Sequence, residues 1–284
     1  MYKIPLLPQK KEAEKMFDEA CKKLGVDKKQ IENLVIYELT DGTRTSTDLE
    51  GWEAYFDGGI YILRLFHLLS LLGSKCAYVL TTGEGHKKRD NYSDIIKSLE
   101  EQVQVYSDYV KNHNMKLKFI VNAPTLARFS SFMRMLRNLE KKSSKNDGFT
   151  AHVLLNYSAG WAYRTGALRN LPNANVIIKH TKGQVNEGLW LPDKLHNNSF
   201  VYVQNASVST NWTDKQLIYL IVIALRSMIF HQGQQYQKSY TESEKEFVKK
   251  MREEKMHFVH KKFDKKCTKR VVMFSNLGPE IYEF

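Results

Sequence analysis

Six short apolar runs recur along this chain of 284 residues, and longer segments with helical periodicity separate them. The runs are rich in Val, Ile, Leu, Tyr and Phe and span 34–39, 76–82, 117–121, 152–156, 176–179 and 200–203. Short and nearly continuous apolar runs are typical of strands that are covered on both faces. Alternation with helices predicts right-handed crossovers, so we expect an α/β fold with a mostly parallel six-stranded sheet.

Apolar residues recur near a 3.6-residue period in the segments between the strands, at 59–72, 91–113, 126–142 and 212–230. This spacing predicts helices that pack one face on the sheet. A final helix is predicted over 242–263, in a tract dense in Lys and Arg. The predicted organisation is a helical N-terminal segment over 1–33, a single α/β domain over 34–235 and a basic helical extension over 236–284.

The formal net charge is +12, with the basic residues concentrated at 10–29, 134–145 and 245–270. Nucleic acid, an anionic membrane surface and a polyanionic substrate are the partners that such a charge can serve. The aromatic residues in the last tract suit an amphipathic basic helix as well as a nucleic-acid surface. We therefore expect no nucleic-acid partner, and we keep peripheral membrane contact as an alternative.

The cysteines and the N-terminus bear on the compartment. Cys21, Cys76 and Cys267 form neither a CxxC pair nor a disulfide framework, which fits a reducing environment. The N-terminal residues show no signal-peptide pattern, and the apolar stretches are short or interrupted by charge. These observations predict a cytoplasmic protein.

Polar loops follow several of the predicted strands, at the edge where parallel sheets bind ligands. The first is Asp41-Gly42-Thr43-Arg44. Gly42 permits a tight turn, hydroxyl and N–H groups can bind oxyanions, and Arg44 can grip a phosphate with two hydrogen bonds. Asp41 can hold a Mg²⁺ that bridges diphosphate oxygens. The alternative interpretation is an ordinary polar turn.

Two further loops extend this pattern. A glycine-rich basic segment with Lys87 follows the second strand, although it lacks the GKS or GKT ending of a P-loop. Lys179 ends the fifth strand and precedes another polar loop. Polar loops beside helices rich in Leu, Ile, Phe and Met predict a ligand with a charged head and a long apolar tail.

The order of these segments resembles the cis-prenyltransferases, the family of undecaprenyl and dehydrodolichyl diphosphate synthases, over about 34–225. The family opens with Asp-Gly-Asn-Arg-Arg, where this chain reads Asp-Gly-Thr-Arg-Thr at 41–45. Its Gly-His-x-x-Gly helix start is similar to the segment 55–59, and its Leu-Asn-Tyr-Gly-Gly-Arg to 155–160. The family's Tyr-x-Phe-Ser-x-Glu-Asn-Trp-x-Arg resembles 78–87, and its Leu-x-Ile-Arg-Thr-Gly-Gly-Glu resembles 176–184.

The resemblance assigns roles to particular residues. It implies that Asp41 is catalytic and binds Mg²⁺ and that Arg44 is catalytic. It also implies that the substrate diphosphate contacts five residues, namely Gly42, Thr43, Arg44, Lys87 and Lys179. An apolar tunnel is expected to lead from Asp41 between the helices at 59–72 and 91–113.

Several family positions are altered in this chain. The arginine that clamps the diphosphate is Lys179, a point charge in place of a fork. The late Arg and Ser of the isopentenyl site fall at Asn186 and Gly188, and the last-strand Glu falls at Ser199. The first diphosphate site is therefore better kept than the second.

Three functions follow from this pattern of retained and lost residues. The first is a Mg²⁺-dependent, prenyl diphosphate-utilising transferase with an atypical acceptor site. The others are a terpene synthase or cyclase on the same fold and a non-catalytic partner subunit of a cis-prenyltransferase. The retained Asp-Gly-x-Arg disfavours the partner subunit. The resemblance also implies a homodimer or a heterodimer.

Overall fold

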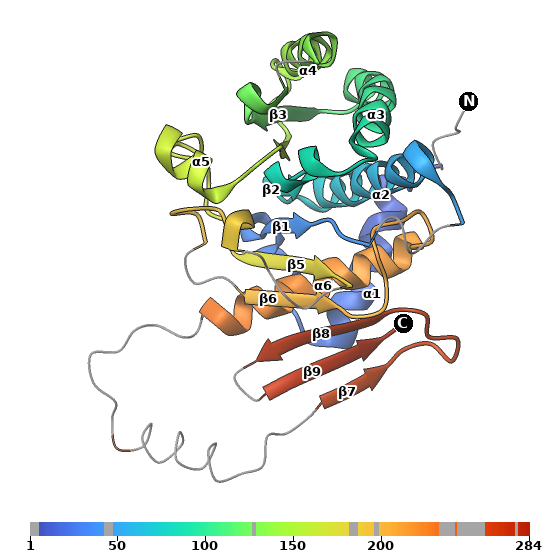
Figure 1. The fold of residues 1–284 in the computed structure, drawn as a ribbon. Coiled ribbons are helices and arrows are strands. Elements are labelled where there is room, and N and C mark those ends of the chain that lie inside the picture. Colours follow the sequence, from blue (N-terminus) through green and yellow to red (C-terminus); the bar gives the residue numbers. More distant parts are fainter. Residues whose placement is uncertain are drawn as a thin grey trace.

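A nine-stranded sheet forms the centre of the computed structural model, in the order β3-β4-β2-β1-β5-β6-β8-β9-β7 (Figure 1). The structure describes residues 6–42, 48–126, 129–181, 187–195, 199–232, 242, 259–275 and 278–284. The six predicted strands are all present and mutually parallel, which confirms the predicted fold class. They are β1 (Val35–Leu39), β2 (Cys76–Leu80), β3 (Met115–Val121), β4 (Phe149–Leu155), β5 (Val176–His180) and β6 (Ser199–Val203).

Most of the helices pack on one face of this sheet and form the larger core with it. They are α1 (Lys10–Leu24), α2 (Gly51–Leu72), α3 (Tyr92–Asn112), α4 (Ser130–Ser143) and α6 (Asp214–Gln232). The other face is covered by α5 (Ala159–Thr165) and by the segment around the short helix η5 (Glu187–Leu189). Tyr37 and Tyr78 on that face donate hydrogen bonds to the carbonyls of Leu189 and Pro172, at 2.6 Å each.

The helix α2 runs through the middle of the larger core. It begins eight residues before the predicted start, so Gly58 and Gly59 lie inside the helix instead of opening it. A Cβ at Gly59 would lie 2.1 Å from Cδ of Gln102 on α3, so the glycine permits the close approach of the two helices. Among the described helices, α2 alone has the length and apolar composition of a membrane span. It is a core helix, because 78% of that window is buried within the protein.

The C-terminal extension differs from the prediction. The end of the helix predicted over 242–263 is a strand, β7 (Val259–Lys262), and β8 (Arg270–Ser275) and β9 (Gly278–Glu283) follow it. These strands lengthen the sheet beyond six because β8 pairs antiparallel with β6. Val271 and Met273 are buried at a spacing of two residues. This strand alternation was hidden by the dense Lys and Arg residues around it.

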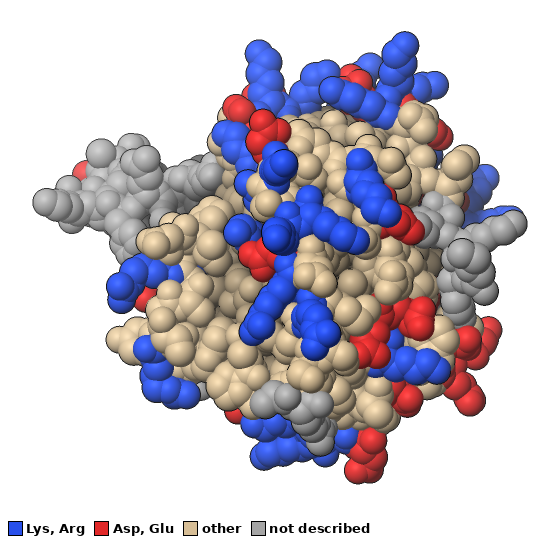
Figure 2. Space-filling view, turned by 90° about the horizontal axis from the view of Figure 1, so that it is seen from above, with Lys and Arg blue, Asp and Glu red and all other residues tan. Residues whose placement is uncertain are grey.

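The solvent-facing surface of α4 is rich in basic side chains. Arg134, Arg137, Lys141 and Lys142 are all exposed there. In the view from above, Lys and Arg project from much of the face, while Asp and Glu gather mostly toward its lower right (Figure 2). The charge of this segment therefore lies on a solvent-facing helix surface.

Candidate active site

The carboxyl ends of β1 and β5 bring Asp41 and Lys179 together. The Lys179 ammonium nitrogen lies 2.6 Å from Asp41 Oδ2 and 3.4 Å from the carbonyl oxygen of His180. Lys179 is only 5% exposed, so Asp41 compensates a buried positive charge. The predicted convergence of the two strand ends is confirmed, and the parallel pairing of β1 with β5 explains it.

Gly42 is fixed between the loops that follow β5 and β6. Its φ is +80°, and a Cβ there would lie 2.6 Å from Cγ2 of Thr181 and 2.8 Å from Cβ of Ser207. Its amide donates a hydrogen bond of 2.8 Å to Asp41 Oδ1. Both the backbone conformation and the lack of space therefore require glycine at this position. Thr43 and Arg44, which were predicted to bind the diphosphate, lie outside the described residues.

The loop after β6 is anchored to α2. Asp57 is buried and accepts hydrogen bonds from the Thr210 amide, at 3.0 Å, and from the Thr210 hydroxyl. Nearby, Arg64 of α2 pairs with Asp214 at 2.7 Å. These contacts hold Ser207 against Gly42 and place Val208 at the cavity described below.

A buried polar cluster lies behind Lys179, on the core side of the sheet. His180 Nε2 lies 2.6 Å from Glu38 Oε1 and 3.3 Å from the Tyr61 hydroxyl, and its Nδ1 lies 3.0 Å from the carbonyl oxygen of Ala206. Burial raises the pKa of Tyr61 well above its usual range. The three side chains do not line the cavity. Their contacts connect β1, β5, α2 and the loop after β6 beneath the candidate site.

The segment after β2 contributes different residues from the predicted one. Lys87, in the short helix η3 (Glu84–Lys88), pairs with Glu84 at 3.0 Å and does not line the cavity. Hydrogen bonding from Lys87 and Ser158 lowers the pKa of Glu84. His86 and Arg89 line the cavity instead. Sequence reasoning selected the basic segment and missed which of its members face the cavity.

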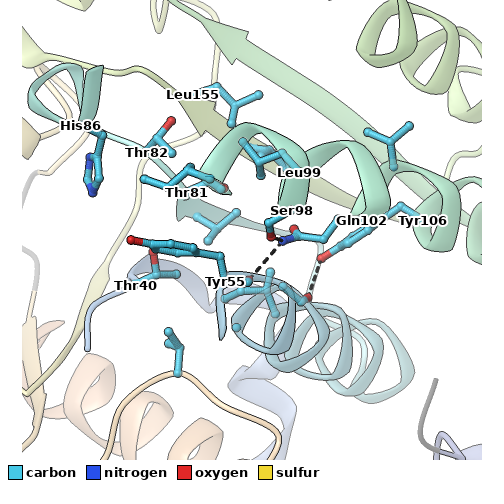
Figure 3. Close-up of a pocket in the computed structure, with 18 of the residues that line it drawn as sticks. Thr40, Tyr55, Thr81, Thr82, His86, Ser98, Leu99, Gln102, Tyr106 and Leu155 are labelled. Carbon is cyan, nitrogen blue, oxygen red and sulfur yellow. Dashed lines mark hydrogen bonds between the residues drawn. The ribbon is translucent and has the colours of Figure 1, made fainter. Parts of the chain in front are cut away.

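A cavity of about 430 Å³ has Asp41 among its lining residues. Figure 3 shows part of its lining, including Thr40, Tyr55 and His86. Its mouth is polar and includes Thr40, Asp41, Gly42, His86 and Arg89. The interior is apolar, with walls from α2, α3, α4, β2, β3 and β4; it is lined by Ile62, Val79, Leu99, Val103, Leu117, Phe119, Phe132, Leu136, Leu139, Val153 and Leu155. A cavity lined by both α2 and α3 is present beside Asp41, as predicted, and its shape as a tunnel stays a prediction.

Polar groups also occur partway along this cavity, where Gln102 of α3 faces α2 (Figure 3). The Gln102 amide nitrogen donates to Ser98 Oγ at 2.9 Å and to the Tyr55 carbonyl at 3.2 Å. The Tyr106 hydroxyl donates to the Gly59 carbonyl at 3.3 Å. Two consecutive glycines in an otherwise bulky helix were the only sequence signal for this close helix contact.

The structure corrects the match made for the acceptor site. Ser199 opens β6 and pairs with Val176, at the amino ends of the parallel strands, whereas Asp41 lies two residues beyond the carboxyl end of β1. The loop that reaches the site follows the carboxyl end of β6. The sequence-motif match at Ser199 therefore falls at the other end of this strand. Gly188 lies in η5, and Asn186 lies outside the described residues.

The fit of Asp41 to Mg²⁺ can be judged from its contacts. The described residues contain no group of three or more His, Cys, Asp or Glu side chains that could hold a metal. A magnesium ion can be bound by a single protein carboxylate when a diphosphate supplies the other ligands, so the contacts of Asp41 are the relevant ones. Its Oδ2 is held by a buried ammonium, and its Oδ1 accepts from Gly42. Both oxygens of Asp41 therefore already accept hydrogen bonds, and the role of Asp41 as a magnesium ligand stays a prediction.

Comparison with known proteins gives a consistent result for the fold. No protein-family model matches the sequence, and no curated protein matches it. Lavandulyl diphosphate synthase from Lavandula x intermedia, solved in complex with dimethylallyl diphosphate, superposes with a TM-score of 0.57 at 13% identity, covering 70% of this chain and 96% of that one. A probable undecaprenyl diphosphate synthase from Campylobacter jejuni gives a TM-score of 0.52 at 12% identity, covering 68% and 94%. The chain therefore has the fold of the cis-prenyltransferases, as the resemblance predicted.

Proposed function

We propose that this chain is a prenyl diphosphate-utilising transferase with an atypical acceptor site. The observation that carries the proposal is a cavity that combines basic and polar lining residues near Asp41 with a largely apolar interior. A volume of about 430 Å³ lies within the range of ligand-binding cavities. A structural neighbour was solved with an allylic diphosphate, which supports this substrate class.

The mouth offers positive charge and N–H donors for a diphosphate. Arg89 and His86 line it, and Lys179 places an ammonium behind the Asp41 carboxylate. When the allylic C–O bond breaks, its electron pair stays on the departing diphosphate. Fixed donors at that position stabilise the developing charge and thus lower the barrier.

The interior protects the carbocation that remains. Its walls are aliphatic and aromatic, with Leu99, Val103 and Phe132 among them. Exclusion of water by such walls prevents hydrolysis of a reactive intermediate. The cation then accepts an electron pair from an acceptor to form the new bond, and the resulting cation loses a proton to a base or to water, which completes the transfer.

The acceptor is proposed to differ from the usual isopentenyl diphosphate arrangement. Lys179 stands in place of the diphosphate-clamping arginine, and Gly188 has no side chain to bind a second diphosphate. These two positions support an acceptor site that differs from the family's usual arrangement.

The test is release of diphosphate from allylic prenyl diphosphates of several lengths, with and without added acceptors. We expect release that falls by about tenfold or more in Arg89→Gln, because a mouth cation is lost. The matched control is Arg137→Gln, an exposed arginine on α4 that does not line the cavity. Its release should match that of the parent protein.

The alternatives give different outcomes in the same assay. Release without any acceptor, accompanied by a hydrocarbon or alcohol product, would indicate a terpene synthase or cyclase. Binding of a prenyl diphosphate without release would indicate a non-catalytic partner subunit. Neither binding nor release with any prenyl diphosphate would refute the proposed substrate class.

A further inference from the structure

The helix α4 has two unlike faces. Phe132, Leu136 and Leu139, spaced by four and three residues, are buried and line the cavity. At about 100° of rotation per residue, the opposite face of the helix falls at other positions, and these are basic. Its exposed cations, together with one in the turn that follows the helix, are Arg134, Arg137, Lys141 and Lys145.

The positive charge of the chain is concentrated in this part. The segment 115–148, which contains β3 and α4, has eight Lys and Arg and two acidic residues, so it carries a net charge of +6, half of the +12 of the whole chain. Figure 2 looks onto the end of the molecule where α4 lies in Figure 1, and Lys and Arg project from much of that face.

These cations are not neutralised by the acids near them. None of the four has an ion pair with another described residue, whereas Glu140 pairs with Lys118 at 3.2 Å and Asp108 of α3 pairs with Lys111 at 2.8 Å. A cluster of exposed, unpaired cations attracts an extended polyanion. None of the four lines the cavity, so this surface is separate from the candidate active site.

The chemistry of the surface favours an anionic membrane over nucleic acid. Proteins that bind single-stranded nucleic acid stack its bases on aromatic side chains. The large apolar side chains that are exposed in the described part of the chain lie outside 115–148; they are Leu6, Tyr163, Trp190 and Phe274. Adsorption to anionic lipids requires only Lys and Arg. In addition, α4 alone separates this surface from the apolar cavity, a thickness of about 10 Å.

We propose that the outer face of α4 docks this protein on an anionic phospholipid membrane. The contact is electrostatic, because no exposed large apolar side chain is described on this face to enter the bilayer. It is therefore weakened by salt. The surface differs from the basic tract at 245–270, and the inference does not depend on the proposed function, since it concerns membrane binding without a prenyl diphosphate.

The experiment is sedimentation of the full chain with vesicles of phosphatidylcholine alone or with phosphatidylserine as about a third of the lipid. We expect partitioning onto the anionic vesicles to be at least about tenfold stronger at about 0.1 M salt, and to be largely lost at about 0.5 M. Equal partitioning onto the two kinds of vesicle, or binding that salt does not weaken, would overturn the proposal.

A triple variant assigns the binding to α4. Arg134→Gln, Lys141→Gln, Lys145→Gln together should weaken partitioning by about 100-fold, because each cation contributes about fivefold. The matched control removes the same charge from exposed positions of α1, which packs on α2 and α6 while α4 packs on α3 and β3. This control is Lys11→Gln, Lys15→Gln, Lys22→Gln, and it should change partitioning by less than about threefold.

Equal losses in the two triple variants would show that net charge drives the binding, and would overturn the role of α4. Both variants replace exposed side chains, and melting temperatures verify that they fold. The comparison of the two kinds of vesicle with the parent protein requires no variant. Nucleic acid is tested with a duplex RNA of mixed sequence in the same buffer. Tighter binding to the RNA than to the anionic vesicles, compared per accessible phosphate, would overturn the membrane as the partner.

Discussion

Acidification should destabilise this protein through His152, a buried histidine on β4. The side chain is 4% exposed and stacks on Tyr78, with ring centroids 4.7 Å apart. Its Nδ1 has no hydrogen-bond partner in the described part of the chain. Burial, with a smaller contribution from Lys118, lowers the pKa of His152 from 6.5 to about 4.

The magnitude follows from the difference between the folded and unfolded pKa values. The folded state disfavours the protonated form of His152. The free energy of unfolding is therefore unaffected by this group above pH 6.5 and decreases as the pH falls towards 4. A shift of about 2.5 units at about 1.36 kcal/mol each corresponds to roughly 3 kcal/mol. This is a large part of the typical stability of a domain, about 5–15 kcal/mol.

The assay is urea denaturation at several pH values between 7.5 and 4, with His152→Phe as the variant. Phenylalanine keeps a ring against Tyr78 and removes the titration. Because other groups titrate in the same range, the informative quantity is the difference between the two pH profiles. The parent should lose about 3 kcal/mol more than the variant on acidification. Parallel profiles would show that the low pKa of His152 is wrong.

Three other substitutions or probes test the packing described above. Gly42→Ala should lower the free energy of unfolding, measured by urea denaturation, by about 2–4 kcal/mol, because φ is positive and a Cβ would lie less than 3 Å from its neighbours. Gly25→Ala should lower it by about 1 kcal/mol, because nothing lies within 4 Å of a Cβ there. Equal losses would contradict the steric argument. Phe132→Ala should enlarge the cavity and lower the free energy of unfolding by about 3 kcal/mol. It should also shift binding towards longer prenyl chains. An unchanged chain-length profile would contradict the place of Phe132 in the cavity wall. Burial raises the pKa of Cys76 to about 11, so a thiol reagent should modify Cys267 first in the native protein, and equal rates at the two sites would contradict the burial.

The parallel strands were predictable because each is a nearly continuous apolar run. The mouth was predictable in part, since Asp41 and Lys179 lie at strand ends and parallel pairing brings strand ends together. The C-terminal strands were missed because basic residues obscure their alternation. Ser199 was misplaced because a short match in letters does not say which end of a strand it occupies.

The contacts inside the cavity could not be predicted from the sequence. The approach of Gln102 to Gly59 depends on where α2 and α3 cross, and no local pattern states this. The choice of His86 and Arg89 over Lys87 depends on the turn of a short 3₁₀ helix. The pairing of Lys179 with Asp41 requires the register of β1 against β5, which links residues 138 positions apart.

Among the described strands, the order of the sheet leaves β3 and β7 outermost. An open edge offers unpaired backbone groups to another copy of the chain, which favours aggregation. Both outer strands carry neighbouring lysines, Lys116 and Lys118 on β3 and Lys261 and Lys262 on β7. Two copies meeting edge to edge along these strands would bring the lysines together, which disfavours such pairing.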